Sequence, residues 1–169
     1  MSQTLKIITA PDPILTRATK KVKEFDQSLQ LLVKNMVRTL HQSDGIGLAA
    51  NQVGRNLRLA VVEFTPGEDS PDDWPPLPLT VLINPKIIKK GKKLVTMEEG
   101  CLSVPNTQRS IARPNEVEVI NHDISGHRYR VRAKGLLARV CQHEIDHLDG
   151  ILITDHASVP AEGGSKHII

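Results

Sequence analysis

The segment 135–148 places the strongest constraint on how this chain can fold. It shows the three- and four-residue spacing of a helix, and Gly150 lies just beyond it, as is typical where a helix ends. Its apolar residues cover much of the circumference: Leu136, Leu137, Val140, Cys141, Ile145 and Leu148. A helix that is apolar on most sides is buried. We therefore expect this helix in the interior, and its few polar residues become candidates for function.

Three of these polar residues form the pattern His-Glu-x-x-His. His143 and His147 are separated by about 40° of rotation and about 6 Å of rise, so both imidazoles can reach one ion. Glu144 can flank the same cavity as a general base. The alternative is a chance pattern of ordinary core histidines. It is disfavoured because burying three ionisable groups together is costly unless a cation compensates them.

The third ligand is expected upstream of this helix. In ordinary zinc proteases with this motif the third ligand lies downstream, but only 22 of the 169 residues follow His147, and they are polar and contain glycine. The downstream candidates are Asp149, Asp155, His156, Glu162 and His167. Cys101, directly after a predicted strand, is the better candidate, because Cys with two His is a known catalytic set with one open position. Cys141 lies about 200° around the helix from His143, so we expect it to pack in the core.

The remaining chain predicts one further helix and several strands. Asp26 is a plausible N-cap for a helix to residue 40, and Gly45 lies beyond its end. The predicted strands are 57–64, 79–84, 93–98, 116–121 and 128–133. Gly91 and Gly126 each suggest a hairpin between neighbouring strands. The segment 66–78 holds five prolines, so we expect a loop, either a solvated insertion or a flap near the site.

Length and composition limit the remaining classes. A chain of 169 residues predicts a single domain over 1–169, with an irregular tail from about residue 157. The net charge of +3 without a dense basic tract, together with 2% aromatics, argues against nucleic-acid specificity. We find neither a signal-peptide pattern nor an apolar run of membrane-spanning length, so we expect a soluble, intracellular protein without membrane contact.

Three segments in this order resemble the peptide deformylase family. They are GIGLAANQ at 45–52, EGCLS at 99–103 and QHEIDHL at 142–148. The resemblance implies an α+β fold with antiparallel strands around a central, buried, metal-binding helix. It implies hydrolysis of the N-formyl group from the N-terminal methionine of newly synthesised polypeptides. It also implies one divalent metal, most often Fe(II), with zinc, nickel or cobalt as alternatives, whereas the ligand set alone would have suggested zinc.

The chemistry can be assigned to individual residues. A metal held by Cys101, His143 and His147 would activate water, and Glu144 would take its proton and deliver it to the leaving amine. By resemblance, the Gln52 side-chain amide and the Leu102 backbone N–H would stabilise the developing oxyanion.

Substrate contacts are also predicted. By resemblance, the segment with Gly45, Ile46 and Gly47 would line the cleft, and the backbone at Ile46 and Gly47 would pair with the extended peptide. Gly45 and Gly47 could instead be plain turn glycines. Arg109 could steer the peptide or be a solvated charge at a strand edge. The residues that we expect around the methionine side chain are Ile46, Met97, Leu136 and Val140. We also expect Arg113 and Asp146 to form a supporting ion pair.

Partners and rival functions complete the sequence-based expectations. The partners would be formyl-methionyl nascent peptides, with at most a transient ribosome encounter, because the tail lacks the long basic helix of some relatives. The location would be the bacterial cytoplasm or an organelle of bacterial origin.

Rival functions are a metalloprotease cutting internal peptide bonds, a cysteine hydrolase with Cys101 as nucleophile and His143 as base, and a non-catalytic metal-binding module.

Overall fold

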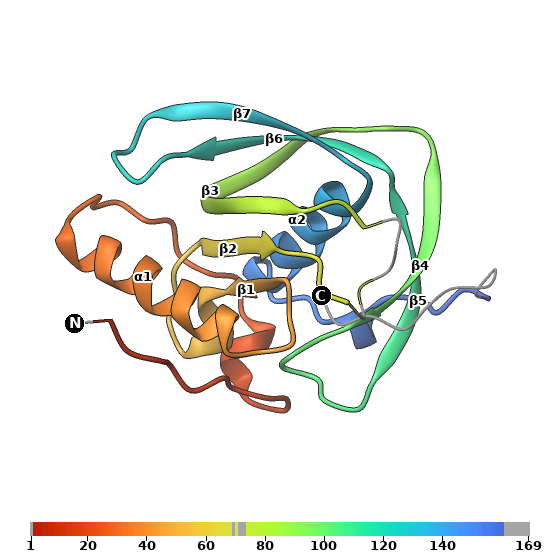
Figure 1. Ribbon diagram of the computed structural model, residues 1–169, viewed down its shortest axis with the longest axis horizontal. Helices are drawn as coiled ribbons and strands as arrows, with labels where there is room; N and C mark the ends of the chain where they lie inside the picture. The colour runs from red at the N-terminus through yellow and green to blue at the C-terminus, as the bar shows by residue number, and fades with distance from the viewer. Residues whose placement is uncertain (1, 69, 71–73, 161–169) are drawn as a thin grey trace.

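The computed structural model describes residues 2–68, 70 and 74–160 and shows an α+β architecture of two antiparallel sheets and two α-helices (Figure 1). The larger sheet has the strand order β1-β2-β3-β6-β7, and the smaller sheet pairs β4 with β5. The predicted α+β class with antiparallel strands is confirmed. The elements are α1 (Gln27–His41), β1 (Gly47–Ala49), β2 (Leu59–Phe64), β3 (Leu77–Lys90), β4 (Leu94–Gly100), β5 (Gln108–Pro114), β6 (Glu116–His122), β7 (Arg128–Lys134) and α2 (Gly135–Leu148), with short 3-10 turns η1 (Pro13–Thr16), η2 (Ala50–Val53) and η3 (Ile153–Asp155).

The helix α2 occupies the interior, as its apolar pattern predicts. It packs against β1, β2 and β7 of the larger sheet and against β5 of the smaller one, and Figure 1 shows it in the middle of the molecule. Cys141 is fully buried within the core cluster around this helix, which confirms its packing role. Gly150 follows the helix with a φ of 78°, a conformation that favours glycine.

The first four residues of β2, 59–62, are buried on both faces of the sheet, which explains their unbroken apolar run. Alternate side chains of a strand point to opposite faces. Accordingly, Leu59 and Val61 belong to the cluster beneath α1, and Ala60 and Val62 to the cluster around α2. The middle of the larger sheet therefore separates two cores, one under each helix.

The predicted helix α1 is confirmed together with its start. Asp26 is the N-cap, and its side chain accepts a hydrogen bond of 3.0 Å from the Leu29 backbone N–H. The apolar face of α1 packs against β1 and β2. No helix in the described part of the chain is long and apolar enough to cross a membrane.

The predicted end of the strand 79–84 at Asn84 was wrong, since β3 continues to Lys90. Pro85 has no N–H for a ladder and argued for termination. The structure accommodates it with a bulge between Ile83 and Lys86, in which Asn84 has a φ of 51°. The Asn84 side chain stabilises this bulge by hydrogen bonds of 2.8 and 2.9 Å with the backbone of Val22.

Other boundaries also need correction. The hairpin predicted at Gly91 is absent, because β3 pairs with β2 and β6 whereas β4 pairs with β5. The hairpin at Gly126 is confirmed between β6 and β7. The loop 66–78 ends two residues early, since β3 begins at Leu77, and its residues 69 and 71–73 lie outside the described residues. Of the expected tail, 157–160 form neither helix nor strand, and 161–169 lie outside the described residues.

Candidate metal and catalytic site

Cys101, His143 and His147 come together where β4 ends beside α2. The sulfur of Cys101 lies 3.2 Å from Nε2 of His147, and the two Nε2 atoms of His143 and His147 are 3.1 Å apart. One ligand atom from each residue lies within 4.8 Å of the others, and all three residues are buried. The spacing of four along α2 therefore does bring both imidazoles to one point, next to the cysteine after β4.

This donor set fits a cation. Three atoms with lone pairs held this close repel one another unless a proton or a metal ion lies between them. Sulfur and imidazole nitrogen bind zinc and related ions at about 2.0 to 2.3 Å, which places neighbouring ligand atoms roughly 3.5 Å apart. The distances of 3.1 and 3.2 Å are close to that value.

The charges of the site also fit a cation. Burial, with a smaller contribution from the charge of Glu144, raises the pKa of Cys101 to about 12 in the metal-free protein. Burial and the neighbouring His143 hold the pKa of His147 well below its ordinary value. His147 is thus held in the neutral form that binds a metal, and a cation would be needed to favour the Cys101 thiolate.

Glu99 orients the first histidine. Burial alone would raise the pKa of Glu99, but hydrogen bonds from His143 and Arg113 outweigh it, and the pKa lies well below its ordinary value. Its carboxylate contacts Nδ1 of His143 at 2.9 Å, which directs Nε2 toward Cys101 and His147. Two buried arginines support it: Arg113 at 2.6 and 2.9 Å and Arg139 at 2.6 Å. The predicted pair of Arg113 with Asp146 is confirmed at 2.7 Å.

Glu144 is fully buried, and neither of its carboxylate oxygens has a hydrogen-bond partner among the described residues. Burial, followed by the negative charges of Glu99 and Asp146, raises its pKa well above the ordinary value. A carboxyl group of this kind is suited to accept a proton and to return it. Gly47 lies directly against it, because a Cβ at position 47 would come within 2.2 Å of Oε1 of Glu144.

Gln52 is held so that its amide NH₂ points toward Cys101. Its Oε1 accepts a hydrogen bond of 2.8 Å from the Ala49 N–H, and its Nε2 donates to Oγ of Ser103 at 3.1 Å and contacts the sulfur of Cys101 at 3.8 Å. The Leu102 backbone N–H donates no hydrogen bond within the part of the chain that the structure describes. Gly45 packs closely on Leu102, since a Cβ there would lie 2.7 Å from Cδ1.

Two cavities lie next to these residues. One of about 590 Å³ opens onto Cys101 and Leu102 and is bounded by residues 104–108. The other, of about 410 Å³, is lined by Met97, Leu136 and Arg139 with Trp74 and other residues. Ile46 and Val140 are buried in the core cluster against which Met97 packs, and neither lines this second cavity. Arg109 is half-buried on β5 and lines neither cavity.

The sequence interpretation missed Glu99, Ser103 and Arg139. A signal existed for Glu99, because Glu98 and Glu99 are adjacent in a strand and alternation turns one of them inward. No sequence signal distinguishes Arg139 from an exposed helix arginine, although it is only 3% exposed.

Comparisons with known proteins identify the family of the chain. The family model described as polypeptide deformylase matches residues 4–162. A peptide deformylase of Picosynechococcus is 45% identical over 85% of this chain and 74% of its own length, and a chloroplastic peptide deformylase 1B of rice is 41% identical over 92% and 55%. The structure of an Acinetobacter baumannii peptide deformylase bound to Met-Ala-Ser has a TM-score of 0.88 at 31% identity, over 93% of this chain and all of the other. The chain belongs to the peptide deformylase family.

Proposed function

We propose that Cys101, His143 and His147 hold the metal ion of this enzyme and that Glu144 carries out its proton transfers. As a member of its family, the chain is a metal-dependent hydrolase that removes the N-formyl group from the N-terminal methionine of newly synthesised polypeptides. The observation that carries the residue assignment is the buried thiol and imidazole set beside a carboxylate whose two oxygens lack partners among the described residues.

We propose Fe(II) as the ion in the cell, with zinc, nickel and cobalt as functional alternatives. A thiolate and two imidazoles suit several of these metals, so the donor atoms alone do not choose among them. The choice of iron follows the family resemblance of the motifs around Cys101 and His143.

The proposed reaction is a single hydrolysis. A bound divalent ion would lower the pKa of a water molecule and polarise the formyl carbonyl. Glu144 takes a proton from the water molecule while the oxygen of that water bonds to the formyl carbon. The Gln52 amide and the Leu102 N–H donate hydrogen bonds to the carbonyl oxygen as it gains negative charge. When the carbon–nitrogen bond breaks, Glu144 delivers the proton to the amine, and formate and the methionyl peptide leave.

We propose that the substrate peptide extends the larger sheet at β1. This strand is at the sheet edge, so one side of the segment formed by Gly45, Ile46 and Gly47 can pair with an extended chain. The relative with bound Met-Ala-Ser supports a peptide ligand of this kind. The methionine side chain would lie among Ile46, Met97, Leu136 and Val140, and Arg109 would steer the following residues.

The wider setting is also proposed. Relatives from bacteria and chloroplasts support the bacterial cytoplasm or an organelle of bacterial origin. We further propose a single catalytic domain over residues 1–169 and only a transient encounter with the ribosome.

The rival functions fit less well. The comparisons do not support a metalloprotease for internal peptide bonds. A cysteine nucleophile would need a thiolate, whereas burial raises the pKa of Cys101 to about 12. A non-catalytic metal-binding module would need neither the buried Glu144 nor the fixed amide of Gln52.

The test is formate release from a formyl-Met peptide by protein reconstituted anaerobically with Fe(II) or with nickel. Glu144→Ala should lose turnover by about 10²-fold or more while keeping its metal. Cys101→Ala should lose both metal and turnover. Full activity in Glu144→Ala would refute the mechanism, and full activity in a chelator would favour the cysteine hydrolase.

A further inference from the structure

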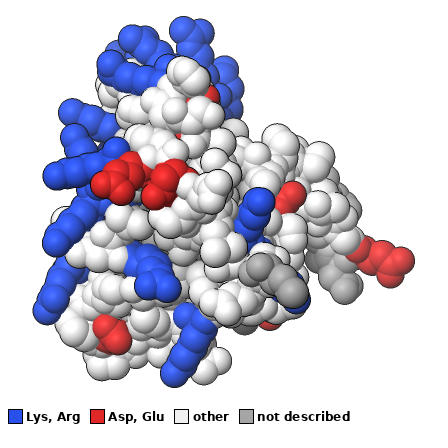
Figure 2. Space-filling model, turned by 90° about the vertical axis from the view of Figure 1, so that its left-hand side faces the viewer, with Lys and Arg blue, Asp and Glu red and all other residues white. Residues whose placement is uncertain are grey.

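The outward face of β3, β6 and β7 carries a concentration of positive charge. Alternate residues of β6 and β7 place their side chains on this surface. On β3, the register shift between Ile87 and Lys89 brings both Lys86 and Lys89 onto it. We call it the basic face, and it consists of Lys86, Lys89, Arg128, Arg130, Arg132 and Lys134 with two carboxylates, Glu116 and Glu118. Figure 2, which looks at the left-hand side of the molecule in Figure 1, shows more Lys and Arg than Asp and Glu on that side.

Most of these cations lack an internal counterion. Arg130 pairs with Glu118 at 3.0 Å, and Lys134 pairs with Glu116 at 3.1 Å. The other four cations of the basic face form no ion pair with any described residue. Six cations against two carboxylates leave an excess of four positive charges, which is larger than the +3 of the whole chain. The excess on this one surface therefore accounts for the net positive charge of the protein.

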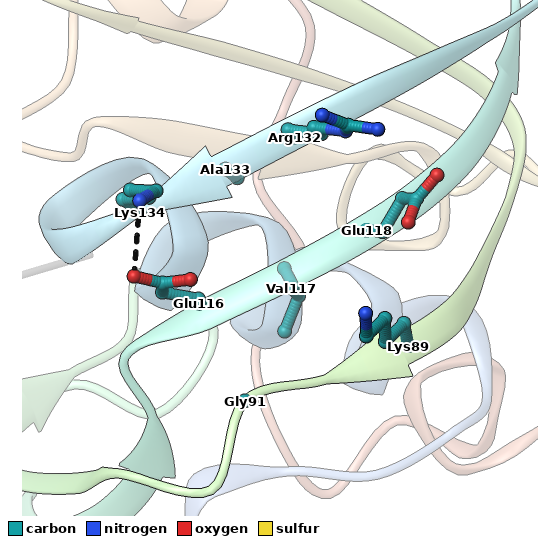
Figure 3. A pocket seen from close by; sticks show the side chains of 8 residues that line it. All are labelled: Lys89, Gly91, Glu116, Val117, Glu118, Arg132, Ala133 and Lys134. Carbon is teal, nitrogen blue, oxygen red and sulfur yellow. Dashed lines mark ion pairs between the residues drawn. The ribbon is translucent and has the colours of Figure 1, made fainter.

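The basic face is also hollowed. A cavity of about 320 Å³ runs across the three strands, and Figure 3 shows Lys89, Glu118 and Arg132 side by side over it. Strand register agrees, because Glu118 lies opposite Lys89 on one side and Arg132 on the other. Lys89 and Arg132, which form no ion pair with a described residue, thus border this cavity.

We infer that the basic face docks the phosphate backbone of RNA. Along β7 the four cations repeat at every second residue, roughly 7 Å apart, which gives a row of charge roughly 20 Å long for a polyanionic strand. The convex phosphate backbone of an RNA can enter this cavity, whereas a planar lipid bilayer cannot contact the residues at its base. With aromatics at only 2% of the chain, base stacking contributes little, so binding should be independent of sequence and sensitive to salt.

The choice of RNA over other polyanions rests on the proposed function, because newly synthesised polypeptides are attached to RNA while they are made. The opposite side of the same strands supports this use of the surface. Val117, Val119 and Ala133 point inward and pack in the core cluster around α2. A partner on the basic face would therefore leave the catalytic site open to the peptide.

The test compares two double variants with the same change in net charge. Lys89→Glu with Arg132→Glu alters the basic face, and Lys6→Glu with Lys34→Glu alters exposed lysines outside it. Binding of the metal-loaded proteins to a labelled RNA duplex is measured by fluorescence anisotropy over a range of salt. The unmodified protein should show a slope of log K against log salt of about −3.6, since four cations are free.

The first variant should bind at least tenfold more weakly, with a slope shallower by about 2. The second should stay within about twofold of the unmodified protein. The inference would be overturned if the protein did not bind RNA at low salt, or if both variants lost binding equally. It would also be overturned if the protein bound anionic vesicles instead of RNA and only the first variant lost that binding. Formate release from a short formyl-Met peptide should be equal in all three proteins, and its loss in all three would count against the proposed function instead.

Discussion

At the scale of single residues, the site depends on how closely backbone and side chain approach. Glu144 needs a buried position because desolvation is the largest cause of its raised pKa. It can occupy this position only because residue 47 has no side chain. Gly47 has no positive φ, so the need for glycine comes from close approach and not from a turn. The interpretation of Gly47 as a plain turn glycine is therefore wrong.

Gly47→Ala tests this close approach. The added methyl group would meet Oε1 of Glu144 at 2.2 Å, so Glu144 must move. We expect kcat for formyl-Met peptides to fall by about 10²-fold, because a small misplacement of a catalytic group is costly. Gly67→Ala is the control, since its nearest neighbour would be 4.0 Å away. Equal kinetics in the two variants would show that Glu144 tolerates displacement.

Gln52→Glu tests the proposed oxyanion donor. The change keeps an oxygen to accept from the Ala49 N–H but removes the amide hydrogens near Cys101. We expect kcat to fall by about 10²- to 10³-fold with little change in KM, because the hydrogen bond strengthens only as charge develops. Ser103→Ala removes the other partner of the same amide and should cost much less. A loss confined to KM would assign Gln52 to binding.

At the scale of elements, the sequence predicted those parts that have a regular period. Both helices follow from apolar spacing and end signals, and the histidine pair follows from helix geometry. The strand β1 is three residues long and shows no period, and β5 carries arginines at Arg109 and Arg113 that obscure its alternation. The length of β3 depends on a bulge that Pro85 conceals. Glu99 and Arg139 could not be paired because their contact joins strand β4 to helix α2 across 40 residues.

Arg139 connects three elements and offers a prediction at this scale. From α2 it donates to Glu99 at 2.6 Å and to the backbone oxygens of Val95 in β4 and Ile111 in β5 at 2.5 and 3.1 Å. Arg139→Met should leave these acceptors short of donors and loosen the support of His143. We expect metal affinity to fall by about 10- to 100-fold, measured as metal retained after dialysis.

Arg38→Met is the matched control, because Arg38 is exposed and, among the residues that the structure describes, donates only to the Ser2 backbone oxygen. It should retain metal as the unmodified protein does. Arg139→Lys keeps the positive charge but loses the several N–H donors of the planar guanidinium group. Its metal retention should therefore lie between those of Arg139→Met and Arg38→Met. Full metal retention in Arg139→Met would mean that Arg113 alone holds Glu99 in place.

At the scale of the whole molecule, metal binding and folding should be linked. The ligands come from the end of β4 and from α2, so an ion bound to them ties the smaller sheet to the central helix. An ion that binds only the folded state at 100 times its Kd stabilises it by about 2.7 kcal/mol. For a chain of this size, that corresponds to a rise in Tm of roughly 5 to 10 °C on metal loading.

This rise in Tm should shrink as the pH falls. Burial raises the pKa of the Cys101 thiol to about 12 in the metal-free protein, so near neutral pH the metal must displace its proton. Protons therefore compete with the metal, and its affinity should fall up to tenfold per pH unit, or about 1.4 kcal/mol. The difference in Tm between nickel-loaded and chelated protein, measured from pH 8 to pH 6, should narrow by roughly 3 to 5 °C per unit. Cys141→Ala provides the control, because burial raises the pKa of that thiol to about 12 as well, yet it lies in the core away from the ligands. The Cys141→Ala variant should keep the same pH dependence, whereas Cys101→Ala should abolish the difference in Tm between loaded and chelated protein. If that difference in the unmodified protein stays constant with pH, Cys101 is not a ligand that loses its proton.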